Sequence, residues 1–247
     1  MNAVLDTHLA SQARRRARRS GSSKRTSRPL LILLGVTLAP LLLIGGTRLL
    51  FAGIASYQAE AFLQDWQKKG QAPNERAWQI AHDAAQRAIA LYPGANGDYQ
   101  HRLGQIHQWR QAIGAPAATR AHHAALAAFR AATQSRPAWP AHWLALAWTK
   151  LQLLEFDDEF HQALAEARRL GPWRIGINRG LVEVGLIAWP QLTTDEHSAV
   201  LEAARRTARF STQEASKLLQ LARQTGRVEL ICQSLDETMK KQRKVCL

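Results

Sequence analysis

The stretch that most constrains the fold of this chain is the apolar run Leu30–Thr47, which contains no charged residue. Its length comes close to the roughly 20 apolar positions that a helix needs to cross about 30 Å of hydrocarbon. We therefore predict a transmembrane helix. It extends to about Ala55, because apolar residues continue beyond Arg48, whose side chain we expect to reach the lipid headgroups. Pro40 lies inside the run and predicts a kink.

The charges that flank this run predict its orientation. Residues 1–28 contain eight Lys or Arg and a single acid, Asp6, and basic flanks stay on the cytoplasmic side of a membrane. We predict a disordered cytoplasmic tail over 1–28, a transmembrane signal-anchor helix over 29–55, and a remainder outside the bacterial inner membrane, in the periplasm, or in a lumen in a eukaryote. The alternative is a cleaved signal peptide, whose apolar core normally spans only about 7–15 residues.

The net charge of +14 over 247 residues would by itself suggest a nucleic-acid partner. Half of it, +7, belongs to the first 28 residues, whereas residues 56–247 carry +6. The basic tail is therefore explained by topology and by attraction to anionic lipids. We expect no nucleic-acid partner.

The two cysteines, Cys232 and Cys246, lie close together near the C-terminus. Outside the cytoplasm a disulfide between them would tie the end of the chain to a helix. Two unpaired thiols are equally compatible with the sequence. Neither their spacing nor their neighbours indicate a metal site, and we expect no cofactor.

The rest of the chain has the periodicity of helices and no alternating strand pattern. We predict a helical stalk and linker over residues 56–74, a helical repeat domain over 75–241 and a C-terminal tail over 242–247. The repeat is indicated by turns at Pro93, Pro137 and Pro172, whose spacings of 44 and 35 residues fit helical hairpins of about 34 residues with one insertion. The predicted helices cover residues 75–91, 98–113, 117–135, 140–154, 157–170, 174–187, 193–209, 211–225 and 227–241.

Local signals at the helix ends support this division. Thr193 with Glu196, and Ser211 with Glu214, have the spacing of capping boxes. Gly226 follows a periodic segment, as glycine commonly does at a helix end.

Two segments resemble the paired helices of a tetratricopeptide repeat. Tyr99-Gln-His-Arg-Leu-Gly-Gln-Ile-His-Gln-Trp109 is similar to the first helix of that repeat, and Ala125-Leu-Ala-Ala-Phe129 to the second. The resemblance implies an all-α, tetratricopeptide-like helical-hairpin solenoid preceded by a single transmembrane helix. An irregular helical bundle is the alternative.

A narrower resemblance lies in Leu91-Tyr-Pro-Gly-Ala-Asn-Gly-Asp-Tyr-Gln-His-Arg-Leu-Gly104, in Arg136-Pro-Ala-Trp-Pro-Ala-His-Trp143, and in Glu159-Phe160 followed by Leu170-Gly-Pro-Trp173. Over about residues 30–190 these segments resemble the VpsP family, single-span proteins of bacterial polysaccharide biosynthesis. The sequence departs from that pattern at Ala95, before the Asn-Gly pair. The resemblance implies a role near an exopolysaccharide assembly or secretion machine, and it implies no catalytic residues.

The sequence carries no familiar catalytic motif. H-E-x-x-H, G-x-S-x-G and a phosphate-binding glycine loop are all missing from it. His122 and His123 are adjacent and so point to different helix faces, and the acids at 157–159 suit the positive end of a helix. We therefore predict that the chain is not an enzyme.

Aromatic and arginine side chains near the predicted turns are the better functional candidates. Tryptophan can stack on sugar rings or anchor a peptide, although an alanine-rich array also needs large residues to fill its core. We expect Trp139 and Trp173, which lie beside prolines at turns, to be partly exposed. The candidate partner-binding residues are Tyr99, Trp109, Arg136, Trp139, Trp143 and Trp173.

Together these features predict a membrane-anchored periplasmic scaffold that assists exopolysaccharide biosynthesis or export. Its expected partners are inner-membrane polysaccharide assembly or export proteins, bound through protein–protein interactions. Two alternatives remain, a direct glycan-binding or glycan-modifying module and a general periplasmic assembly factor.

Overall fold

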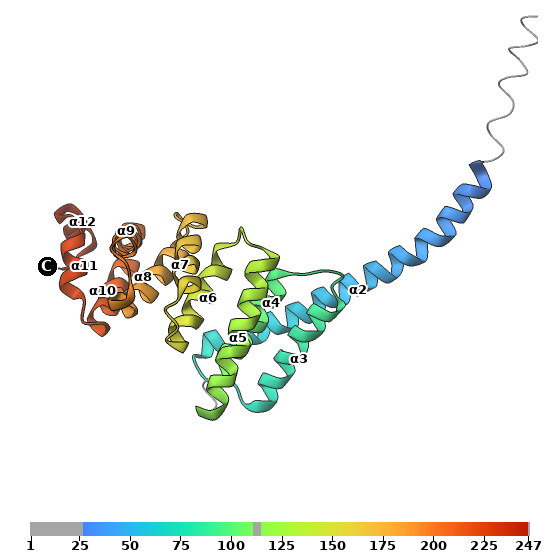
Figure 1. The fold of residues 1–247 in the computed structure, drawn as a ribbon, viewed down its shortest axis with the longest axis horizontal. Helices are drawn as coiled ribbons and strands as arrows, with labels where there is room; N and C mark the ends of the chain where they lie inside the picture. The colour runs from blue at the N-terminus through green and yellow to red at the C-terminus, as the bar shows by residue number, and fades with distance from the viewer. Residues whose placement is uncertain (1–26, 111–114, 247) are drawn as a thin grey trace, which may run out of the picture. The chain divides into compact units, whose positions relative to one another are not determined.

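The computed structural model describes residues 27–110 and 115–246, and these residues are almost entirely helical (Figure 1). The chain divides into two compact units, Met1–Leu50 and Phe51–Leu247. Nearly all of the predicted cytoplasmic tail lies outside the described residues. No strand occurs in the part of the chain that the structure describes, and the predicted all-α class is confirmed.

The N-terminal unit contains the first part of α2, a helix over Ser27–Lys69 that continues through Pro40. Its large apolar side chains from Ile32 to Leu50 are exposed on every side. A helix that is apolar all round is suited to lipid. From Ile32 onward, α2 is long and apolar enough to cross a membrane, and a signal sequence near the N-terminus would have the same character.

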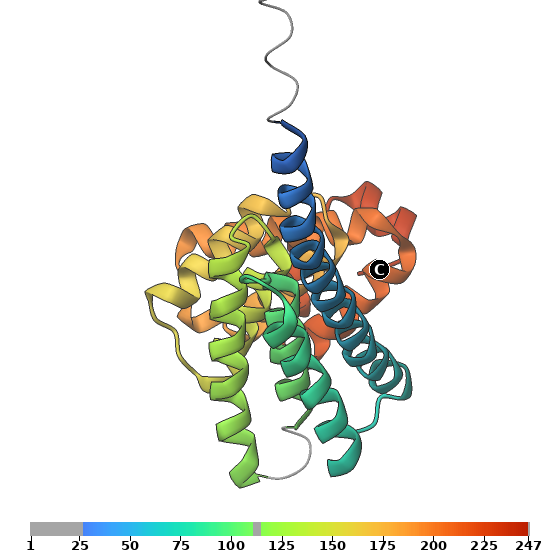
Figure 2. The ribbon, with the colours of Figure 1, turned by 90° about the vertical axis from the view of Figure 1, so that its right-hand side faces the viewer.

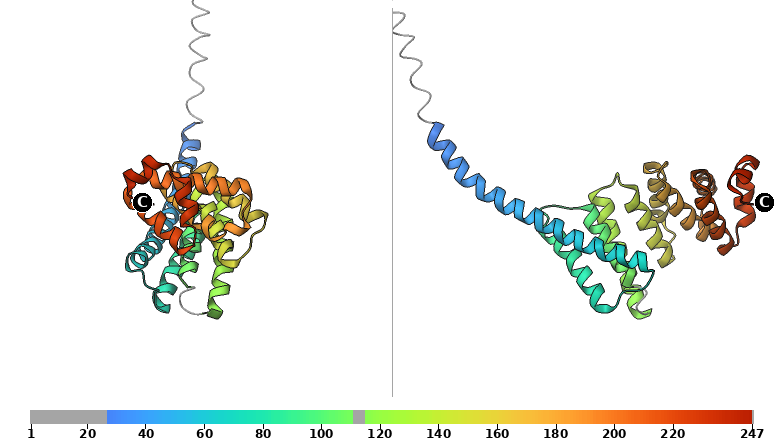
Figure 3. Two further views of the ribbon diagram at one scale, coloured as in Figure 1. Left: turned by 90° about the vertical axis from the view of Figure 1, so that its left-hand side faces the viewer. Right: turned by 180° about the vertical axis from the view of Figure 1, so that it is seen from behind.

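The larger unit is an array of helical hairpins in which consecutive helices pack against each other (Figures 1 and 2). Seen from behind, in Figure 3, the helices follow one another in chain order. This confirms the predicted hairpin array. The elements after α2 are α3 (Glu75–Leu91), α4 (Gly97–Arg110), α5 (Ala115–Ser135), α6 (Pro140–Leu153), α7 (Asp158–Leu170), α8 (Ile175–Ile187), the 3-10 helix η2 (Trp189–Gln191), α9 (Thr194–Phe210), α10 (Thr212–Gln224), α11 (Val228–Ser234) and α12 (Glu237–Arg243).

The second half of α2 belongs to this array. Ala59, Leu63 and Trp66 are buried against α3, where Trp78 donates a hydrogen bond of 2.8 Å from its indole nitrogen to the carbonyl oxygen of Ile106. Residues 56–69, which the sequence predicts as a stalk outside the repeat domain, are thus the first helix of its first hairpin. Periodicity shows that this segment is an amphipathic helix, but it does not show what covers the apolar face.

The predicted helix caps are confirmed in one case and half confirmed in the other. Thr193 and Glu196 form both hydrogen bonds of a capping box at the start of α9. Ser211 accepts a hydrogen bond from the Glu214 backbone N–H at 3.1 Å. The Glu214 carboxylate does not return to the cap, however, because it pairs with Arg179 at 2.8 Å.

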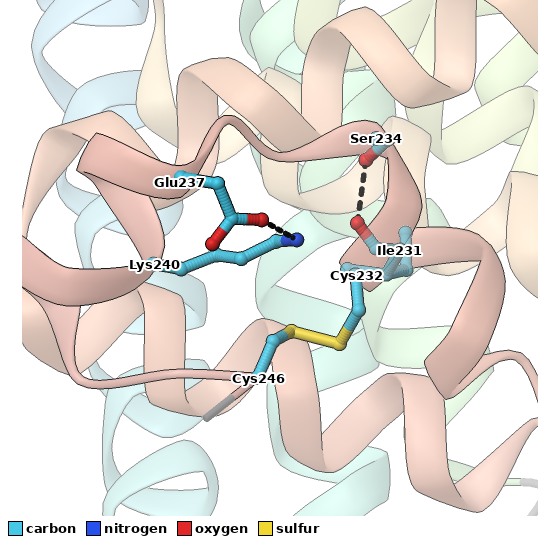
Figure 4. Close-up of a disulfide and its surroundings, with 6 residues drawn as sticks. All are labelled: Ile231, Cys232, Ser234, Glu237, Lys240 and Cys246. Carbon is cyan, nitrogen blue, oxygen red and sulfur yellow. Dashed lines mark hydrogen bonds and ion pairs between the residues drawn. A yellow bond between two sulfur atoms is a disulfide. The ribbon is translucent and has the colours of Figure 1, made fainter.

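The C-terminal end differs from the prediction. The single helix expected over 227–241 is broken into α11 and α12, because Asp236 caps α12 by accepting a hydrogen bond of 2.7 Å from the Met239 backbone N–H. A disulfide joins Cys232 to Cys246, with their α-carbons 5.6 Å apart (Figure 4). Val245 is buried. The predicted tail over 242–247 is therefore held to the array at Val245 and Cys246, and the disulfide is consistent with a domain outside the cytoplasm.

Candidate partner-binding edge

Two turns between successive hairpins have the same construction. They are Arg136–Trp139, between α5 and α6, and Gly171–Arg174, between α7 and α8, and proline is the second residue of each. In both turns the backbone N–H of the fourth residue donates to the carbonyl of the first, at 3.2 and 3.1 Å respectively. Proline favours this position because its ring fixes the required backbone angle. Equivalent positions lie 35 residues apart, one helical-hairpin repeat.

Each turn is braced by a side chain from the helix that follows it. The Trp143 indole nitrogen donates to the carbonyl oxygen of Pro137 at 2.7 Å, and the Asn178 amide nitrogen donates to the carbonyl oxygen of Pro172 at 3.0 Å. Trp143 and Asn178 are themselves 35 residues apart. Trp143, a predicted partner-binding residue, therefore holds a turn in place.

The fourth residue of each turn is the N-cap of the next helix, yet neither side chain caps it. Trp139 precedes α6 and Arg174 precedes α8, and neither makes a side-chain capping hydrogen bond. Helices prefer Ser, Thr, Asp or Asn at this position. Instead, the guanidinium carbon of Arg174 lies 4.5 Å from the Trp139 ring centroid, and that of Arg136 lies 4.2 Å from it. The indole thus lies within reach of two guanidinium groups.

The next tryptophan extends this arrangement. Trp173 is 82% exposed, and the guanidinium carbon of Arg206, on α9, lies 4.6 Å from its ring centroid. Arg206 also donates a hydrogen bond of 3.0 Å to the carbonyl oxygen of Pro172. We call this set of stacked side chains the Arg–Trp row: Arg136, Trp139, Arg174, Trp173 and Arg206.

The charge of the row is only partly balanced. Arg136 pairs with Asp98 at 2.6 Å, and Arg206 pairs with Glu202 at 3.0 Å. Arg174 is exposed and has no acidic partner among the residues that the structure describes. A guanidinium on an indole face keeps its planar set of N–H donors available for a carboxylate or phosphate. The row is therefore suited to an anionic partner that also offers a flat apolar surface.

The remaining sequence candidates lie elsewhere. Trp109 packs edge-on to Trp66, with ring centroids 6.0 Å apart, as part of the core around α2 and α3. Tyr99 contacts Tyr92 at the turn between α3 and α4, with ring centroids 5.5 Å apart. Sequence reasoning missed Arg174 and Arg206, although the 35-residue spacing from Trp139 was a signal for Arg174.

At the junction of α6 and α7, the charged side chains of one cluster form ion pairs with each other. Lys150 is fully buried, and its ammonium lies 3.0, 2.9 and 2.8 Å from the carboxylates of Glu155, Asp157 and Glu159. Glu159 also pairs with Arg130 at 2.6 Å. Burial lowers the pKa of Lys150, but the hydrogen bonds that its ammonium donates to the three carboxylates outweigh this, and the net shift is upward. The cluster fastens α7 to α6.

Partly or fully buried histidines form two further contacts. The His101 and His142 ring centroids lie 4.9 Å apart, and those of His82 and His107 lie 5.2 Å apart. Burial, followed by the neighbouring His142, lowers the pKa of His101 to about 3, and burial lowers the pKa of His107 to about 4. Both are neutral at physiological pH. Within the described ranges, no group of three His, Cys, Asp or Glu side chains is placed to hold a metal ion.

A groove of about 400 Å³ lies beside α7 and α9. Its lining includes the apolar side chains of Leu164, Leu181 and Val200 together with His161, whose ring nitrogen lies 2.8 Å from the Glu196 carboxylate. Leu164, Leu181 and Val200 also belong to the core that packs these helices together, and the His161 ring is already paired with Glu196. We therefore assign the candidate site to the Arg–Trp row.

Comparison of the chain with protein-family models and with curated proteins found no match. The fold and the site define its class as an all-helical array of sequential hairpins with one long apolar helix near the N-terminus.

Proposed function

We propose that this chain is a membrane-anchored helical-repeat scaffold that holds an acidic partner against the Arg–Trp row. The observation that supports this most is the stacking of Arg174 on Trp139 across two successive turns. The helix N-caps do not require these side chains, and Arg174 and Trp173 are exposed. Exposed tryptophan and arginine are enriched at the sites that dominate binding energy in protein interfaces.

We further propose that the partner belongs to an exopolysaccharide assembly or export complex of a bacterial inner membrane. The support is the sequence resemblance described above. Of the segments that carry it, 136–143 includes the first turn of the Arg–Trp row and 170–173 includes the first three residues of the second. The row is thus where the resemblance and the exposed chemistry coincide.

The proposed topology places the N-terminus in the cytoplasm and the repeat domain in the periplasm. Support comes from the basic flank before the apolar helix and from the disulfide between Cys232 and Cys246. A reporter enzyme that is active only outside the cytoplasm, fused after Leu247, should be active. An inactive fusion in an intact, membrane-bound product would refute the proposed localisation.

A complementation experiment tests the role of the row. In a strain that lacks the gene, the wild-type chain and Arg76→Gln should restore polymer secretion equally, because Arg76 is an exposed arginine outside the row. Arg174→Gln combined with Trp173→Ala should reduce secretion about tenfold or more at equal protein level, as expected when binding hot spots are removed. Equal secretion by both variants would refute the proposed site.

A titration separates the scaffold from a direct glycan-binding module. An acidic oligosaccharide that binds the row directly should change the tryptophan fluorescence of the purified protein, and Trp139→Phe should diminish that response. A scaffold that binds a protein partner should give no response to the sugar. A saturable response that is lost in Trp139→Phe would favour the glycan-binding alternative.

A further inference from the structure

At the start of the larger unit, one face of α2 is buried and the opposite face is exposed. Ala52 and Ala55 are buried against the domain. Phe51, Ile54 and Tyr57 lie on the other side of the helix, where they are 57, 54 and 77% exposed. Large apolar side chains next to each other on a surface normally mark a contact with a partner or a membrane. In sequence they follow directly on the apolar run of α2.

The exposed face changes character just beyond Tyr57. Following the same face along α2, the next exposed residues are Ala61, Gln64 and Lys68. From Leu30 to Tyr57 the helix rises about 42 Å at 1.5 Å per residue, which matches a bilayer of about 40–45 Å with its headgroups included. Tyrosine is enriched where membrane meets water. The change from apolar to polar therefore falls where a membrane surface is expected.

A second segment, distant in sequence, lies at the same level. The Arg87 guanidinium donates a hydrogen bond of 3.3 Å to the Gln58 side chain. Because only the short link over 70–74 separates the two helices, this contact makes α3 run antiparallel to α2. This register places the turn between α3 and α4 level with Phe51–Ile54, and the turn can be followed beside α2 in Figures 1 and 2. Residues 88–97 contain no charged side chain, and Pro93, Gly94 and Ala95 within them are exposed.

The side chains around this turn are those found at membrane surfaces. Tyr92 and Tyr99 are in contact there, and with Tyr57 they provide three tyrosines near one end of the domain. Arg87 is exposed and makes no ion pair within the described residues. Its guanidinium is therefore available to a lipid phosphate. We call this region the juxtamembrane end: Phe51, Ile54, Tyr57 and residues 91–97.

We propose that the juxtamembrane end lies in the headgroup layer of the phospholipid bilayer. This inference rests on the membrane anchor of the proposed function. It adds that the repeat domain rests on the membrane surface, because its first helix is already packed against α3 and α4 where it leaves the lipid. The occupant of the exposed apolar face is phospholipid, since its residues follow directly in sequence on the apolar run and the helix up to Tyr57 has the length of a bilayer with its headgroups.

Site-specific fluorescence in vesicles tests this. The full chain is reconstituted into vesicles of phosphatidylethanolamine and phosphatidylglycerol, with and without a spin-labelled quencher lipid. Cys232 and Cys246 are joined, so a single introduced cysteine is the thiol that takes an environment-sensitive dye. Ala95→Cys places the dye on the juxtamembrane end, and Ala72→Cys is the matched control, an exposed alanine in the turn at the other end of α3. The 17 residues of α3 separate the two positions by about 25 Å.

We expect the dye at Ala95→Cys to emit at shorter wavelength and to be quenched about threefold more than the dye at Ala72→Cys, because headgroup depth brings it near the quencher. A third variant, Leu43→Cys, reports on the apolar helix itself. Quenching at Leu43→Cys with equal, weak quenching at the two alanine positions would overturn this inference and leave the anchor intact. Equal, strong quenching at both alanine positions would also overturn it. An unquenched Leu43→Cys would overturn the anchor, and the inference with it.

Discussion

The ring of Phe129, on α5, lies directly against the α-carbon of Gly104, on α4. A β-carbon built on Gly104 would be only 2.6 Å from a ring carbon of Phe129, closer than real β-carbons approach another atom. Phe129 is fully buried. The absence of a side chain at Gly104 therefore allows α4 and α5 to approach closely here.

Replacing Gly104 by alanine should destabilise the array by about 1–3 kcal/mol, because the buried ring of Phe129 has to move. Gly176→Ala is the matched control, since Gly176 is exposed in α8 and has nothing within 4 Å of a built β-carbon. It should leave stability unchanged or raise it by up to about 1 kcal/mol. Urea midpoints of the full chain in detergent measure both. Equal midpoints for the two variants would contradict the close packing.

Stability should fall as the pH is lowered from about 6.5, the ordinary histidine pKa, toward 4. The folded-state pKa of His101 is lowered to about 3 and that of His107 to about 4, chiefly by burial. Below about 6.5 the unfolded chain takes up protons that the folded chain does not, at up to about 1.4 kcal/mol per pH unit for each group. Above that pH the two histidines are neutral in both the folded and the unfolded chain, so they cause no loss of stability.

Urea midpoints measured from about pH 7.5 to 5 test this expectation. The double variant His101→Leu, His107→Leu should show a shallower loss of stability over that range than the wild-type chain. Parallel curves for the two proteins would show that other groups cause the acid sensitivity.

Lys150→Met should destabilise the domain strongly. Its buried ammonium separates three carboxylates, and their mutual repulsion is unbalanced once it is removed. Removing one partner of a buried ion pair costs about 3–5 kcal/mol, and we expect about 2–3 kcal/mol here because the carboxylates are partly exposed. Lys68→Met, at an exposed site on α2, should change stability by less than about 0.5 kcal/mol. Thermal unfolding that gives similar losses for both would contradict a structural role for the cluster.

The disulfide should protect the last two helices from proteolysis. It closes a loop between residues 14 positions apart in sequence, and a loop of that size stabilises by about 3 kcal/mol in the chain-entropy account. Cys246→Ser should therefore speed tryptic cleavage after Lys241, while cleavage after Lys69, far along the array, stays the same. Thiol labelling of the denatured, unreduced wild-type chain should find no free cysteine. Full labelling would show that the bond does not form.

Much of the secondary structure was determined by sequence alone, because its signals are local. The Thr193–Glu196 cap involves residues three positions apart, and prolines at 137 and 172 stop helices wherever those helices pack. The apolar run from Leu30 likewise predicts a long helix from its own length and lack of charged residues. In contrast, the break at Asp236 was missed, since its capping hydrogen bond competes with an otherwise continuous helical pattern.

The tertiary structure alone decided which side chains meet. Arg174 and Trp139 are 35 residues apart and come together only when two hairpins stack in register. The same stacking buries one face of α2 after Leu50 and leaves Phe51, Ile54 and Tyr57 open on the other. Hydrophobic periodicity in the sequence indicates the apolar and polar faces of a helix. Which helix covers each face depends on contacts between distant parts of the chain. The helices were therefore predictable, and the Arg–Trp row and the juxtamembrane end were not.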